Sequence, residues 1–215
     1  MPIARGARVL FQGDSITDAG RNHAAIEAND ADGMGNGYAY LAICRLLADR
    51  PDEGLAFFNR GISGNKAVDL LERWEEDCLS LRPDLVSVLI GVNDLWHGID
   101  GAGGRSAEEY EQDLRRLLDR TRQRLPQAAI VVGEPFVLRT GAVDGRWFPE
   151  FDMRRAAARR QAEAAGALFV PFQAVFDDAV RAGSAPAYWA DDGVHPTPQG
   201  HQLMADAWIA AVEGS

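Results

Sequence analysis

The chain has 215 residues, of which 47% are hydrophobic and 25% are charged, a composition typical of a globular protein with a sizeable core. Its formal net charge of −10 argues against a nucleic-acid partner and against binding to anionic membrane surfaces. The sequence has neither an apolar leader at its start nor a run approaching the roughly 20 apolar residues of a membrane-spanning helix.

Short apolar runs alternate along the chain with longer segments of helical periodicity. The runs predict buried strands over Val9–Gln12, Ala56–Asn59, Leu85–Ile90, Ala129–Gly133 and Ala167–Pro171. The periodic segments predict helices over Tyr38–Leu47, Val68–Cys78, Glu109–Leu125, Asp152–Ala165 and from Thr197 onward. This alternation predicts a parallel sheet with helices on both faces, built as one domain over residues 1–215. Long loops are expected at Gly98–Arg105 and at Pro135–Pro149.

The two cysteines, Cys44 and Cys78, lie in helical patterns among apolar neighbours. This placement favours reduced core cysteines in a cytoplasmic protein, with a disulfide as the alternative. The histidines His23, His97 and His201 have no carboxylate or cysteine set at metal-ligand spacing, so we expect neither a metal nor another cofactor.

Polar residues follow several predicted strands at the point where each strand ends. Ser15 comes directly after the first run, Asn59–Lys66 follows the second and carries two glycines, and Asn93 follows the third. The carboxyl ends of parallel strands meet at one edge of a sheet, where ligands bind. A serine nucleophile could use its own N–H, a glycine N–H and the Asn93 amide as donors to an oxyanion.

The segment Asp192–Pro196 supplies the remaining groups for nucleophilic catalysis. His195 can act as the base, and a carboxylate three residues earlier can hold its Nδ1–H after one turn of chain. Asp191 is an adjacent alternative for the carboxylate, and the spacing of three favours Asp192. Ser15, His195 and Asp192 thus form a predicted catalytic triad.

These segments resemble the four sequence blocks of the SGNH hydrolase superfamily, also called the GDSL esterases. The matching blocks are Gly13–Ile16, Ile62–Asn65, Gly91–Asp94 and Asp192–His195. The resemblance implies that the oxyanion donors are the N–H groups of Ser15 and Gly64 and the side chain of Asn93. It also implies a three-layer α/β/α sandwich of flavodoxin-like type, with a five-stranded parallel sheet in the order 2-1-3-4-5.

A narrower resemblance concerns bacterial acetyl-xylooligosaccharide esterases of this superfamily. It rests on Gly13–Asp18 with Gly20-Arg21, on Gly35–Tyr38, on Gly61–Asn65, on Arg73–Asp77 and on Ile90–Asp94. It implies a cytoplasmic, homo-oligomeric serine esterase that removes acetyl groups from short xylan fragments. The resemblance is weaker at Pro135–Pro149 and at Ala187–Ala190, which are therefore candidate substrate-contact regions.

Aromatic side chains in the expected rim loops are candidates for stacking on a sugar ring. They are Trp96, Trp147, Tyr188 and Trp189, and Asp14 beside the serine is added as a candidate substrate contact. The alternative interpretation is that some of these aromatic residues only pack the loops.

Three other functions are compatible with parts of the pattern. One is an SGNH lipase, thioesterase or lysophospholipase, which a preference for long acyl chains would reveal. Another is a flavodoxin-like nucleotide- or flavin-binding protein, although the two acids of Gly13–Asp18 would repel phosphate and no glycine-rich dinucleotide motif is present. The last is a carbohydrate-binding relative without activity, against which the full catalytic set argues.

Overall fold

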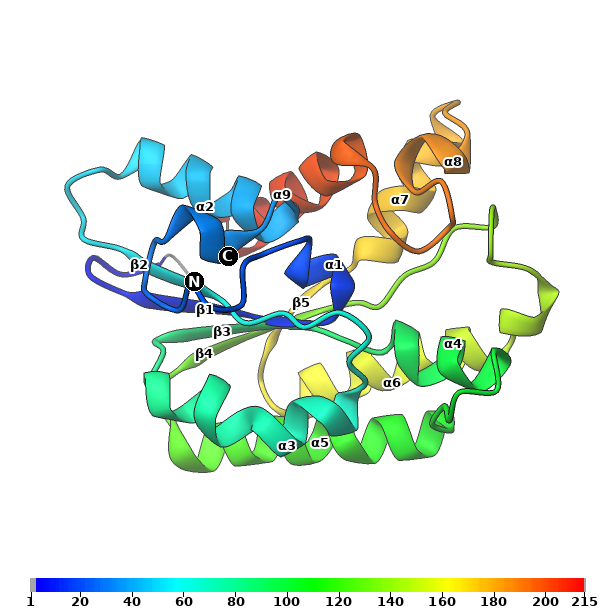
Figure 1. Ribbon diagram of the computed structural model, residues 1–215, viewed down its shortest axis with the longest axis horizontal. Coiled ribbons are helices and arrows are strands. Elements are labelled where there is room, and N and C mark those ends of the chain that lie inside the picture. Colours follow the sequence, from blue (N-terminus) through cyan, green and yellow to red (C-terminus); the bar gives the residue numbers. More distant parts are fainter. Residues whose placement is uncertain (1–2, 215) are drawn as a thin grey trace.

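Five parallel strands form the centre of the structure, a computed structural model that describes residues 3–214. The strands are β1 (Arg8–Gly13), β2 (Ala56–Asn59), β3 (Leu85–Leu89), β4 (Ala129–Gly133) and β5 (Leu168–Val170). They lie in the order β2-β1-β3-β4-β5, with β3 in the middle of the sheet (Figure 1). The register pairs Gly13 with Leu89 and Leu89 with Gly133, so three strands end side by side.

Helices cover both faces of this sheet (Figure 1). One face carries α2 (Tyr38–Asp49), α7 (Phe172–Arg181) and α9 (Pro198–Glu213), and the other carries α3 (Ala67–Asp77), α5 (Ala107–Arg124) and α6 (Glu150–Ala164). The shorter elements are α1 (Ser15–Asp18), α4 (Val92–Ile99), α8 (Pro186–Trp189), and the 3₁₀ turns η1 (Ala31–Met34), η2 (Leu79–Leu81) and η3 (Gly145–Trp147). The expected three-layer sandwich and strand order are confirmed.

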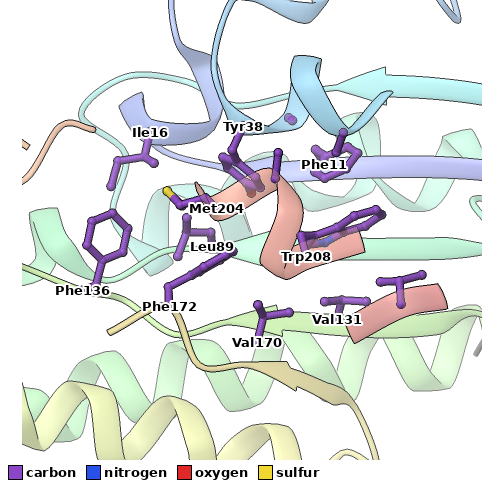
Figure 2. Close-up of a cluster of buried hydrophobic side chains, with 14 of the residues drawn as sticks. Phe11, Ile16, Tyr38, Leu89, Val131, Phe136, Val170, Phe172, Met204 and Trp208 are labelled. Atoms are coloured by element: carbon purple, nitrogen blue, oxygen red, sulfur yellow. The ribbon is translucent and has the colours of Figure 1, made fainter. Parts of the chain in front are cut away.

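A large apolar core fills the space between the sheet and the helices α2, α7 and α9 (Figure 2). Phe11 of β1 packs against Trp208 of α9 with ring centroids 4.8 Å apart. The indole N–H of Trp208 donates to Ser87 Oγ at 2.9 Å, which satisfies its one polar group inside the core. This cluster holds α9, the helix that follows His195 in sequence, firmly on the sheet.

The second core lies under α3, α5 and α6. Trp74 of α3 is fully buried there and donates its indole N–H to Thr121 Oγ1 of α5 at 3.0 Å. Helix α5 begins two residues before the predicted start, because Ser106 and Glu109 form a capping box at its N-terminus.

The expectation that both cysteines lie in the core is wrong for Cys44. Helix α2 turns Tyr38, Ala42 and Leu46 toward the core, so Cys44 lies on its outer face and is exposed. Cys78 is buried as expected, and both thiols are free. None of the helices within residues 3–214 combines the length and apolar character needed to cross a bilayer.

Candidate active site

Ser15 lies in a tight turn between β1 and α1, at the carboxyl edge of the sheet. The turn needs glycine before it, because a Cβ at Gly13 would lie 2.4 Å from the Leu89 carbonyl oxygen and from Thr17 Oγ1. Asp14 caps the short helix by accepting a hydrogen bond from the Ile16 N–H at 3.1 Å. Ser15 is therefore the first helical residue, and its side chain is half-buried at the surface.

Three predicted residues are brought together by a chain of hydrogen bonds. Ser15 Oγ lies 2.8 Å from Nε2 of His195, and Nδ1 of the same ring lies 2.7 Å from Oδ2 of Asp192. Asp192 Oδ1 also accepts from the backbone N–H groups of His195 at 2.7 Å and Val194 at 2.8 Å. A nucleophile, a base and an orienting carboxylate thus stand in the geometry that acyl transfer requires.

The environment of Asp192 favours its ionised form. Partial burial alone would raise its pKa, but the hydrogen bonds from the His195 ring and from the backbone outweigh burial and hold the pKa below its ordinary value. An ionised Asp192 keeps the proton of a neutral His195 on Nδ1, which leaves Nε2 free to accept the proton of Ser15.

The loop Pro135–Pro149, which was expected only as a substrate-contact region, holds Asp192 in place. The N–H of Leu138 donates to the Gly193 carbonyl at 2.8 Å, and the N–H of Ala142 donates to the Asp192 carbonyl at 2.8 Å. Gly193 has a φ of +87°, and a Cβ there would lie 2.5 Å from the Leu138 carbonyl oxygen. Sequence offered one signal for this role, the apolar stretch at residues 136–138, which is buried.

The two remaining predicted oxyanion donors lie in turns after β2 and β3. Gly64 has a φ of +82°, and its N–H makes no hydrogen bond to any other residue of the described chain. Asn93 is buried and donates one amide hydrogen to the Asn65 carbonyl at 3.1 Å, which leaves its other amide hydrogen for a ligand. Gly91, with a φ of +133°, makes the turn that starts α4 just before Asn93.

Comparison with known proteins identifies the family of this chain. A sequence model of the GDSL-like lipase/acylhydrolase family matches residues 11–203. The chain belongs to this family. The resemblance read from the four sequence blocks is therefore confirmed.

The relatives of this GDSL-family protein include proteins of known structure. The chain is 36% identical to an acetylxylan esterase from Geobacillus stearothermophilus over 216 residues, covering 99% of this chain and 96% of that one. A crystal structure of that esterase has a TM-score of 0.88 at 34% identity, again covering 99% and 96% of the two chains. A candidate GDSL-like lipase from Parabacteroides merdae has a TM-score of 0.93 at 45% identity, covering 98% of this chain and 97% of that one.

The predicted aromatic contacts of this GDSL-family protein fall into two groups. Trp96 is half-buried, with its ring centroid 5.8 Å from that of His195. Tyr188 is 51% exposed and packs edge-on against the half-buried Trp189, and the Tyr188 carbonyl accepts from Thr197 Oγ1 at 2.8 Å. Trp96 thus has surface close to the triad, whereas Tyr188 and Trp189 lie on α8, which accepts a hydrogen bond from Thr197, two residues after His195.

Trp147 and Asp14 were expected to contact substrate, and this expectation is wrong for both. Trp147 is fully buried, packs between Trp96 and Phe151, and donates its indole N–H to the Ala142 carbonyl at 3.0 Å. Asp14 is buried beneath Ser15, where its carboxylate caps α1. Neither side chain presents a surface to a ligand.

Two buried carboxyl groups underlie the site of this GDSL-family protein. Burial raises the pKa of Asp14 to about 7, and it raises the pKa of Asp94, the neighbour of Asn93, to about 7 as well. Asp94 accepts from the Ala67 N–H through both oxygens, which ties the start of α3 to α4. Across residues 3–214, His, Cys, Asp and Glu side chains form no group of three or more able to hold a metal ion.

Proposed function

We propose that this protein is a serine esterase that hydrolyses short acyl esters, chiefly acetyl esters on carbohydrate such as acetylated xylooligosaccharides. The observation that carries the proposal is the chain of hydrogen bonds from Ser15 through His195 to Asp192, at 2.8 Å and 2.7 Å. Membership of the acylhydrolase family and similarity to an acetylxylan esterase support it. Structures of catalytic mutants of that esterase carry alanine in place of a serine and of a histidine, which fits the same chemistry.

The mechanism follows from the positions of these groups. Ser15 Oγ attacks the ester carbonyl carbon while His195 Nε2 takes its proton, and Asp192 stabilises the imidazolium that forms. The N–H groups of Ser15 and Gly64 and the Asn93 amide donate to the oxyanion of the tetrahedral intermediate. His195 then protonates the leaving alcohol, and water hydrolyses the acyl-serine by the same route.

The aromatic surroundings of the triad favour a carbohydrate alcohol. Trp96 beside His195, and Tyr188 with Trp189 on the neighbouring α8, offer aromatic surface for stacking on sugar rings. Release of acetate from a panel of acetylated oligosaccharides, with acyl chain length varied in parallel on simple esters, tests this specificity. A preference for long acyl chains or for thioesters would instead assign the site to a lipase, lysophospholipase or thioesterase.

Replacement of the nucleophile tests the proposal most directly. Ser15→Ala should abolish hydrolysis of a chromogenic acetate ester and leave the thermal unfolding midpoint within a few degrees of the wild type, because the side chain lies at the surface of a turn. Hydrolysis by Ser15→Ala at a rate within tenfold of the wild type would refute the assignment.

Two further properties are proposed from the resemblance alone. We expect a homo-oligomer, which light scattering on the purified protein tests, and a cytoplasmic location, which fractionation of the native cells tests. Neither property enters the catalytic argument.

A further inference from the structure

Asp18 is a buried carboxylate that the proposed mechanism does not use. It is the last residue of α1, the four-residue helix on which Ser15 is the first residue, and it is 4% exposed. Its N–H donates to the Asp14 carbonyl at 2.8 Å, so the helix fixes its position relative to Ser15. Asp18 also ends the Gly13–Asp18 segment, where its carboxylate was expected only to repel phosphate.

The carboxylate of Asp18 binds the turn that contains Gly64. Oδ2 accepts from the N–H of Ser63 at 2.9 Å and from its hydroxyl at 2.7 Å, and it lies 3.2 Å from Nε2 of His23. Oδ1 accepts from the N–H of Arg21 at 3.2 Å. Burial would raise the pKa of Asp18, but the hydrogen bonds from Ser63 and His23 outweigh burial and lower it, so the charged form persists.

Two hydrogen bonds on Ser63 restrict the peptide group that follows it. The Gly64 N–H belongs to the peptide bond between Ser63 and Gly64, so its direction depends on the orientation of Ser63. Gly64 itself gives little support, because nothing lies within 4 Å of a Cβ placed there and its φ of +82° is typical of flexible glycine. Hydrogen bonds, rather than packing on Gly64, must therefore set the direction of this donor.

Neighbouring contacts hold the other residues of the turn, and the Asn65 N–H donates to the Ile62 carbonyl at 3.2 Å, which closes the turn around Ser63 and Gly64. Arg21 Nε donates to the Gly61 carbonyl at 2.7 Å, and Arg73 Nε donates to Asn65 Oδ1 at 2.8 Å. These bonds hold the two ends of the turn. The side-chain hydrogen bonds to Ser63, which tie the centre of this turn to the helix of Ser15, come from Asp18.

We propose that Asp18 is a positioning residue that couples the nucleophile to the oxyanion donor, because it ties the helix bearing Ser15 to the turn bearing the Gly64 N–H. The inference rests on the proposed function. Oxyanion donors act most strongly on the transition state, so a misdirected Gly64 N–H should lower kcat and leave KM nearly unchanged.

The substitution Asp18→Asn tests the coupling with little change of volume. The Asp18 carboxylate accepts hydrogen bonds on both oxygens, from the Arg21 N–H on Oδ1 and from Ser63 on Oδ2. An asparagine amide has one oxygen that accepts and one NH₂ group that donates, so either Arg21 or Ser63 loses its acceptor. We expect kcat on a chromogenic acetate ester to fall by roughly 10-fold to 100-fold, less than the upper range for losing a donor outright. KM should stay within about twofold, and the Ki of phenylboronic acid, which forms a tetrahedral adduct with an active serine, should rise in parallel with the loss of kcat.

Asp30→Asn is the matched control, because Asp30 caps η1 by accepting from the Asp32 N–H and, within the described chain, makes no hydrogen bond to residues 61–65. Its kcat, KM and Ki should equal those of the wild type. If Asp18→Asn does not fold, as judged by circular dichroism, Ser63→Ala decides, since it removes only the 2.7 Å hydroxyl bond and should lower kcat severalfold.

The outcomes separate this inference from the proposed function. Equal rates for wild type and Ser15→Ala would overturn the proposed function and the inference with it. A wild type that depends on Ser15, with an unchanged kcat in Asp18→Asn or in the deciding Ser63→Ala, would overturn the inference alone. A rise in KM without a loss of kcat would overturn it too, because a donor that acts in the transition state does not predict that pattern.

Discussion

Replacing Asp192 by asparagine is expected to disable the base while leaving its position intact. Asp192 Oδ1 accepts from two backbone N–H groups, those of Val194 and His195, at 2.8 Å and 2.7 Å. Asparagine has one carbonyl oxygen, which must face these two donors, so its NH₂ faces His195 Nδ1. The ring then accepts at Nδ1 and carries its proton on Nε2, the nitrogen 2.8 Å from Ser15 Oγ.

A neutral ring protonated on Nε2 cannot take the proton of Ser15. We therefore expect Asp192→Asn to lower kcat on a chromogenic acetate ester by about 10⁴-fold, which corresponds to roughly 5.5 kcal/mol of transition-state stabilisation. KM should change little, because both carboxylate oxygens bond to His195 and Val194 rather than serving as substrate contacts in the proposed mechanism.

The neighbouring Asp191 provides a matched control for charge and sequence position. Asp191 is exposed, and Asp191→Asn should leave kcat within about twofold of the wild type. The reasoning would be refuted if Asp192→Asn kept activity within tenfold of the wild type, or if Asp191→Asn lost as much as Asp192→Asn.

Three further predictions concern stability and reactivity. Burial, with a smaller effect of His195, lowers the pKa of His201 from 6.5 to about 4. Between these two pH values the unfolded chain binds a proton at His201 and the folded chain does not. The free energy of unfolding should therefore fall as the pH drops from about 6.5 to 4, by roughly 3 kcal/mol at most. Urea unfolding at pH 7 and pH 4.5 should show a smaller loss for His201→Gln, and an equal loss would contradict this cause. Leu114→Ala, in the core under α5, should cost about 2–5 kcal/mol in urea unfolding, and a cost below 1 kcal/mol would contradict tight packing there. A thiol reagent should label the exposed Cys44 in the native protein but Cys78 only after unfolding, and equal labelling rates would contradict the burial of Cys78.

Much of the fold was predictable because buried parallel strands have a simple sequence signature. The runs predicted at Ala56–Asn59 and Ala129–Gly133 match β2 and β4 residue for residue, and the other three strands match within one residue at each end. A strand buried on both faces is apolar throughout and ends where glycine, asparagine or proline follows. The positions of Ser15 and Asn93 at strand ends followed from the same runs.

Two helices of eight or more residues were missed, for different reasons. Helix α7 was not predicted, although Phe172, Phe176 and Val180 recur at the spacing of one helical face. Helix α4 begins at Val92 because Gly91 adopts a φ of +133°, which turns the chain directly from strand into helix. The polar residues after Gly91 are typical of turns as well as of first helical turns, so the sequence alone did not separate the two.

Burial of single side chains was the least predictable feature. A tryptophan in a loop can stack on a ligand or fill the space under the loop. The tertiary contacts of Trp147 with Trp96 and Phe151 show that this tryptophan fills the space under its loop. Cys44 and Cys78 share an apolar sequence environment, yet Cys44 lies on the outer face of α2 and is exposed, whereas Cys78, the residue after α3, is buried. Such outcomes depend on packing between elements distant in sequence.

Hydrogen bonds to backbone groups, rather than packing, set the relative positions of the predicted catalytic groups. These groups lie on four separate segments at the sheet edge, which begin or end in turns, and turns expose polar backbone that packing alone does not fix. The segment of Leu138 and Ala142 binds the turn of Asp192, and Asn93 binds the carbonyl of Asn65. Asp18 binds the turn of Gly64 to the helix of Ser15. These hydrogen bonds join one segment of the site to another. Replacing one of the polar residues outside the triad that makes them should therefore raise the activation free energy of the reaction by more than it lowers the free energy of unfolding.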